Sequence, residues 1–229
     1  MNDRRIGADT LVDTVTQTHA VLYARMRSAA ACRPTRESPR ARYTATDPFL
    51  ASTSRHLGAA NAVLSPAAKR YLDGGPQRAQ EFAQQCKRLE IALSQVKAKL
   101  YGSTFVVRRP WNSIWEEVDR ELSETRRLED GLVADLGAAQ PDDCEELAER
   151  LYRTERRVPT RPHPYLPHLG LPGRVARRVA VQVDRFWDTA EGRMIPEPVH
   201  PHRSRDGRLA MYLLADPHVT DEDAAEGLS

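Results

Sequence analysis

Two histidines, His19 and His56, are the residues of this chain whose type and position are best suited to chemistry. Each recurs with apolar residues at helical spacing, so each is expected on the buried face of an amphipathic helix. Buried histidines that face one another across packed helices are a common basis for a metal site in proteins. A complete site requires further donors from the neighbouring helices.

The third and fourth predicted helices supply candidate donors. Cys86 and Glu90 lie one turn apart on the third helix, and Glu129 lies at the edge of the apolar stripe of the fourth. By helical angle Glu121 also lies at that edge, whereas Glu124 lies well away from it. Either Glu121 or Glu124 is the inward partner on this helix, and the pattern does not choose between them.

Four long, one-sided helices are expected to position these residues, over about 9–31, 47–67, 76–101 and 111–136. Asp47-Pro48 is typical of a helix start, and Pro66 is expected to kink or end the second helix. The connections are mostly short, which favours antiparallel neighbours. The sequence therefore predicts an all-α, up-down-up-down four-helix bundle over residues 9–136.

A C-terminal extension, residues 137–196, is predicted to pack on this bundle. It comprises a fifth helix at about 143–156, a proline-rich segment at 159–173 and a sixth helix at 174–191. The sixth helix opposes arginines to an aliphatic and aromatic face. A membrane surface could bind this face, but packing on the bundle or in a homodimer is the favoured interpretation. Residues 197–229 are predicted to form a mostly disordered acidic tail.

Composition excludes several functional classes. A formal net charge of +2 over 229 residues gives no expectation of nucleic-acid binding. Three widely spaced cysteines fit neither a disulfide framework nor a zinc ribbon, and no apolar run spans a bilayer. These features predict a cytoplasmic protein. No nucleophile–base pair, phosphate-binding loop or dinucleotide motif supports enzymatic turnover.

In its order of motifs the chain resembles the hemerythrin-like proteins, the HHE cation-binding group, in their actinobacterial form. The resemblance covers residues 9–136. It depends on the histidine in the middle of the first helix, on Val63-Leu64-Ser65-Pro66 at the end of the second-helix segment, and on the LVADL sequence that ends the fourth helix. The later segment PTRPHPYLPH is similar to a proline–histidine run of those proteins. Members hold two irons, and they bind oxygen or sense oxidants and iron.

The resemblance implies a reduced ligand set. It assigns metal-binding roles to His19, His56, Glu90 and Glu129, and weaker ones to Cys86 and Glu124. Ala60 stands where a bridging glutamate is expected, Ser65 where a histidine is common, and Leu128 where an acidic residue is common. Because a shared carboxylate both neutralises and spaces two cations, a di-iron centre is not expected. A single ion, iron first, remains compatible with the donors present.

Two hypotheses for function follow. In the first, the bundle binds one metal ion and senses or stores iron, oxygen or oxidant without catalysis. In the second, the histidines form hydrogen bonds in the core, Cys86 is a small apolar core residue, and the protein is a metal-free interaction or regulatory module.

Overall fold

The computed structural model describes residues 2–102, 108–158 and 196–201. These ranges contain five α-helices and one 3₁₀ turn, and they contain no β-strand. The predicted all-α class is confirmed. In chain order the elements are α1 (Asn2–Ala31), α2 (Ala41–Tyr71), α3 (Gly75–Leu100), α4 (Trp111–Ala139), η1 (Pro141–Asp143) and α5 (Cys144–Glu155).

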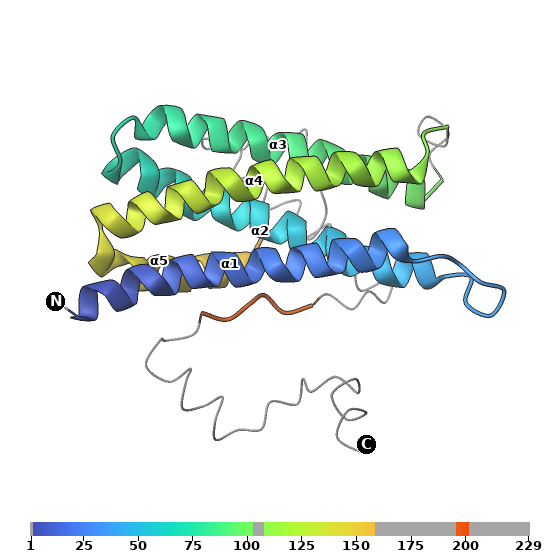
Figure 1. Ribbon diagram of the computed structural model, residues 1–229, viewed down its shortest axis with the longest axis horizontal. Coiled ribbons are helices and arrows are strands. Elements are labelled where there is room, and N and C mark those ends of the chain that lie inside the picture. Colours follow the sequence, from blue (N-terminus) through green and yellow to red (C-terminus); the bar gives the residue numbers. More distant parts are fainter. Residues whose placement is uncertain (1, 103–107, 159–195, 202–229) are drawn as a thin grey trace, which may run out of the picture.

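The four long helices lie alongside one another, and successive connections alternate between the two ends of the molecule (Figure 1). Helix α2 packs against α1 and α3, and α4 packs against α3 and α1. Each long helix therefore has two long neighbours and buries one face between them. The shorter α5 packs against α1 and α2, at the end of the molecule where α1 begins (Figure 1).

Helix α2 differs from the prediction at both proline positions. It begins at Ala41, before the expected start at Asp47, and it continues through Pro48 and Pro66. A proline inside a helix removes one backbone hydrogen bond and costs about 3 kcal/mol. Buried side chains on both sides of each proline, such as the fully buried Phe49, offset that cost. Tertiary burial therefore extends this helix where local propensity would end it.

Other helix boundaries also differ from the prediction. Helix α1 begins at Asn2 rather than at Asp9, and α4 ends at Ala139 rather than near residue 136. The predicted fifth helix is present as α5, directly after the 3₁₀ turn. The proline-rich segment, the sixth helix and most of the acidic tail fall outside the described residues, so those predictions remain untested. No helix in the described ranges is long and apolar enough to cross a membrane.

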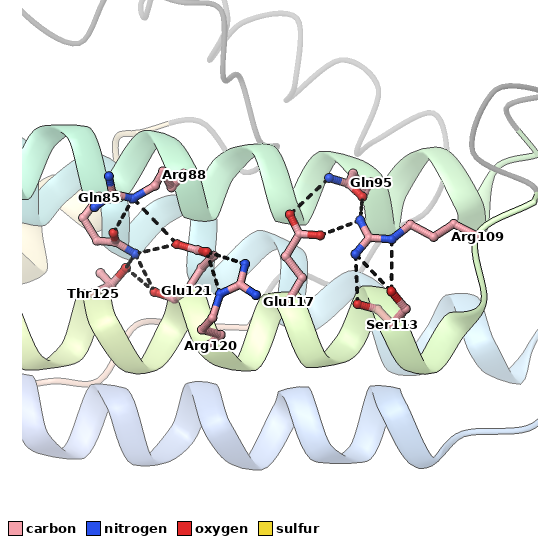
Figure 2. Close-up of polar contacts among 9 residues, drawn as sticks. All are labelled: Gln85, Arg88, Gln95, Arg109, Ser113, Glu117, Arg120, Glu121 and Thr125. Atoms are coloured by element: carbon pink, nitrogen blue, oxygen red, sulfur yellow. Dashed lines mark hydrogen bonds and ion pairs between the residues drawn. The ribbon is translucent and has the colours of Figure 1, made fainter.

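Polar side chains join α3 to the start of α4 (Figure 2). Arg109, just before α4, donates to Gln95 of α3 and forms an ion pair with Glu117 of α4. The same guanidinium donates to the carbonyl and hydroxyl oxygens of Ser113, at 3.1 and 3.2 Å. Arg109 thus fixes the start of α4 against α3.

The chain after α5 approaches α2 closely at a glycine. A Cβ atom added to Gly58 would lie 3.4 Å from the nearest side-chain atom of Val158. The backbone reaches this point through a turn in which the amide of Val158 donates to the carbonyl of Thr154 at 3.1 Å. The chain just after α5 therefore packs directly on α2 at this glycine.

Candidate metal centre

Three buried side chains from three helices converge in the interior: His19 of α1, His56 of α2 and Glu129 of α4. The Nε2 atoms of both histidines lie 3.0 Å from the same carboxylate oxygen, Oε2 of Glu129. His19 and Glu129 are fully buried, and His56 is 1% exposed. These are three of the four residues that the sequence analysis predicts as metal ligands.

Helical periodicity explains why these side chains meet. His19 lies one turn after Val15, which is fully buried, so both side chains point from α1 into the same core. Glu129 lies one turn after the fully buried Thr125 on α4. His56 likewise precedes the fully buried Ala60 by one turn on α2. Each functional group occupies an apolar-stripe position, which forces it to find a partner inside the core.

The geometry of the cluster fits a metal ion. The imidazole rings lie edge to face, with centroids 5.2 Å apart and an interplanar angle of 85°. One donor atom from each of His19, His56 and Glu129 lies within 4.8 Å of the other two. Donors on a tetrahedral ion at about 2.1 Å would be roughly 3.4 Å apart, so a small outward shift makes room. The cluster could therefore hold a metal ion.

A fourth buried group, Glu155, touches the cluster from α5. Its Oε1 atom lies 2.8 Å from Nδ1 of His56, on the opposite edge of the ring from Glu129. Sequence analysis did not identify this residue, although a signal was present. Glu155 follows the buried Leu151 by one turn and Ala148 by two, in register with the apolar stripe of its helix. A carboxylate on such a stripe needs a buried partner.

Mutual attraction controls the protonation of the cluster. Burial opposes the charged form of Glu129, but His56 and His19 outweigh it and lower the pKa of this carboxyl to about 2. Burial likewise opposes the charged form of His56, but Glu129 and Glu155 outweigh it and raise the pKa of this imidazole to about 10. These shifts favour a protonated His56 beside an ionised Glu129 when no metal ion is bound.

The two histidines differ in how many of their ring nitrogens have hydrogen-bond partners. Both ring nitrogens of His56 have carboxylate partners. In contrast, Nδ1 of His19 and Oε1 of Glu129 are buried and have no hydrogen-bond partner within the described part of the chain. Unsatisfied buried polar atoms are rare in folded proteins. Their presence here shows that hydrogen bonding within the cluster is incomplete.

The α3 candidates, Cys86 and Glu90, lie in the core but do not join the cluster. Both residues are buried, and neither belongs to the group of converging donor atoms found in the described residues. Burial, together with the nearby carboxylates of Glu129 and Glu90, raises the pKa of the Cys86 thiol well above its usual value. Cys86 is therefore held as a neutral thiol, as in the interpretation of it as a small core residue.

The two remaining candidates, Glu121 and Glu124, point away from the cluster. Glu121 accepts from Gln85 and from Arg120 at the surface between α3 and α4 (Figure 2). Glu124 pairs with Arg127 at 2.7 Å, one turn along the same helix. Neither residue is therefore the inward partner on α4, because each carboxylate pairs with an arginine at the surface.

No family model, no curated protein and no solved structure matches the chain. The resemblance to hemerythrin-like proteins therefore stays a prediction from the sequence motifs.

Proposed function

We propose that this chain is a non-catalytic metal-binding protein that holds one divalent ion, iron first, at His19, His56 and Glu129. In this role it senses or stores iron, oxygen or oxidant. The observation that carries the proposal is the convergence of three buried donor groups from three separate helices.

The donor set favours a metal with open coordination positions. Two imidazoles and one carboxylate are the ligands of mononuclear non-haem Fe(II) sites, and a similar set binds catalytic zinc. In both cases three protein donors leave positions for a small molecule. Such a site suits a sensor of oxygen or oxidant better than a purely structural role, in which four protein donors normally close the shell.

A single ion is proposed instead of two because the described part of the chain offers one set of converging donors. Ala60, fully buried one turn after His56, offers only a methyl group where the resemblance expects a bridging carboxylate. Within the described residues one group of converging donors is present, and it contains a single carboxylate. Two adjacent cations would repel one another without a shared anion between them.

The charge of the cluster also favours a divalent cation. The side chains of Glu129 and Glu155 contribute two formal negative charges to this part of the interior, and a protonated His56 contributes one positive charge. A divalent ion that displaces one proton from His56 brings the sum to zero. Metal binding commonly releases protons from its ligands in this way, and an uncompensated buried charge is costly.

We also propose that α1–α4 form an up-down-up-down four-helix bundle of the hemerythrin-like type. The alternating connections and the mutual packing of neighbouring helices support this assignment (Figure 1). The cluster lies where bundle proteins build their metal sites, on side chains that face inward from several helices.

A second function has its own supporting observation. Both histidines already bond to one oxygen of Glu129 at 3.0 Å, and His56 bonds to Glu155 as well. A hydrogen-bonded network of this kind can stabilise a core without an ion. In this alternative the protein is a metal-free interaction module, and its partner or second copy binds through the C-terminal extension.

Metal analysis tests the proposal against the alternative. Wild-type protein from an iron-supplemented culture is expected to contain about one equivalent of metal, and His19→Ala and His56→Ala are expected to contain none. His200→Ala serves as the control, because His200 is an exposed histidine and should leave the metal content unchanged. Wild-type protein that contains no metal, and takes up none when Fe(II) is added without oxygen, would contradict the proposal and favour the interaction module.

A further inference from the structure

The helix α5 lies outside the four long helices, yet it delivers a carboxylate to the cluster. Glu155 is the last residue of this helix, and its side chain is 7% exposed. Its Oε1 atom meets Nδ1 of His56 at 2.8 Å, while Nε2 of the same ring faces Glu129. The two ring nitrogens of His56 therefore contact different carboxyl groups, on opposite edges of the ring.

This arrangement fixes which nitrogen of His56 can bind a metal ion. When Nδ1 carries the proton and donates a hydrogen bond to Glu155, the lone pair of a neutral imidazole lies on Nε2. That lone pair is directed at Glu129 and His19. A carboxylate behind a ligating histidine also makes the imidazole a stronger donor. Nδ1 of His19 has no such partner among the residues described, so His56 is the better prepared of the two histidines.

The surroundings of Glu155 hold the carboxylate in place. A cavity of about 20 Å³, lined by Arg25, Ser52, Glu155 and Pro196 among others, lies against it. This volume is enough for about one water molecule. Arg25 is partly buried there, donates to Ser52, and interacts electrostatically with Glu155. Nearby, Arg55 donates to the carbonyl of Pro196 at 2.9 Å and so holds the segment 196–201 over this region.

From this geometry we propose that Glu155 is a positioning residue of the metal centre, which fixes the orientation and tautomer of His56 for metal binding at Nε2. The inference rests on the proposed function and extends it. The complete centre then requires α5, beyond the four long helices.

Titration of the full-length protein with Co²⁺ tests this role. Loss of an outer carboxylate partner of this kind typically weakens metal binding 10- to 100-fold, and Glu155→Ala is expected to weaken Co²⁺ binding by that factor. Glu155→Gln should lose less, because its amide oxygen still accepts a hydrogen bond from Nδ1–H. Glu146→Gln, an exposed site on the same helix, is the matched control and should bind as the wild type does.

Nitrogen NMR adds a measurement that a purely structural role would not change. In the Zn²⁺-loaded protein with ¹⁵N-labelled histidine, the wild type and Glu155→Gln should show an exchange-protected proton on Nδ1 of His56. Glu155→Ala should lose that protection. If Glu155→Ala does not fold, Glu155→Asp replaces it, since it keeps the charge but shortens the reach by one methylene; it should also lose affinity.

A loss smaller than fivefold in Glu155→Ala, or an equal loss in Glu146→Gln, would overturn this inference alone. Equal losses in Glu155→Ala and Glu155→Gln would also overturn it, because charge rather than orientation would then be responsible. Absence of Co²⁺ and Zn²⁺ binding in the wild type would instead overturn the proposed metal function, and this inference with it.

Discussion

Two glutamates on α4, two turns apart, have opposite environments. Glu129 is fully buried and accepts from two histidines. Glu121 has a side chain that is 13% exposed and lies among Gln85, Arg88 and Arg120 (Figure 2). For both carboxyls burial opposes ionisation. The neighbouring cations and hydrogen-bond donors outweigh it and lower the pKa in both cases.

Glu121 and Glu129 differ in which groups can replace a hydrogen-bond or ion-pair partner that is lost. At Glu121 water can compensate for a lost contact, because the neighbouring Arg88 and Arg120 have side chains that are 54% and 70% exposed. Among the described residues Glu129 has the two histidines as hydrogen-bond partners, so a change there leaves buried groups without partners. Similar pKa directions therefore correspond to very different consequences for stability and for ligand binding.

The largest effect is expected for Glu129→Ala. Removal of one partner from a buried ion pair costs about 3–5 kcal/mol, and this variant should lose that much free energy of unfolding in urea at pH 7. It should also lose all bound metal. A variant within 1 kcal/mol of the wild type would show that His56 is not charged in the folded protein.

The pH dependence of the metal-free protein is the next expected effect. The pKa of His56 is raised to about 10, so its stabilising contribution is complete below the unfolded value near 6.5 and is lost as the pH rises towards 10. The pKa of Glu129 is lowered to about 2, so its contribution is complete above about 4.5 and is lost as the pH falls towards 2. Stability from this pair should be greatest between about pH 4.5 and 6.5.

Urea unfolding in the presence of a chelator measures this profile. One proton difference corresponds to a slope of about 1.4 kcal/mol per pH unit, and the free energy of unfolding should fall at up to this rate between about pH 6.5 and 10. His56→Gln is expected to flatten the alkaline limb. An equally steep limb in that variant would assign the titration to another group.

A smaller effect is expected for Glu121→Ala. Partly exposed ion pairs contribute about 1 kcal/mol or less, so the free energy of unfolding should fall by no more than that, and the metal content should not change. Loss of metal in this variant would contradict its position outside the cluster.

The smallest effect is expected for Glu124→Ala. Its contact with Arg127 lies at the surface, where water and salt screen the pair. Unfolding free energy and metal content should both equal those of the wild type. A clear change in either would mean that Glu124 has a second, inward position.

Periodicity in the sequence identifies faces of helices, and this was enough to select His19, His56 and Glu129. It does not give the distance between residues on different helices, so Glu90 was selected although it lies outside the group of converging donors. Glu155 lies on α5, outside the four long helices from which ligands are expected, although its position on the apolar stripe of that helix is the same kind of signal. The start of α2 at Ala41 is not predicted by Asp47-Pro48, because a proline can lie inside a helix when its neighbours, here Thr46 and Phe49, are fully buried.

The close approach of Val158 to Gly58 brings together the two segments that carry Glu155 and His56. Gly58 lies two residues after His56, and Val158, which rests on it, lies three residues after Glu155. A Cβ atom at position 58 would lie 3.4 Å from Val158, at the near limit of ordinary van der Waals contact, so a side chain longer than a methyl group there would compete with Val158 for space. The size of residue 58 therefore limits how closely the chain that follows the fifth helix can lie against the second.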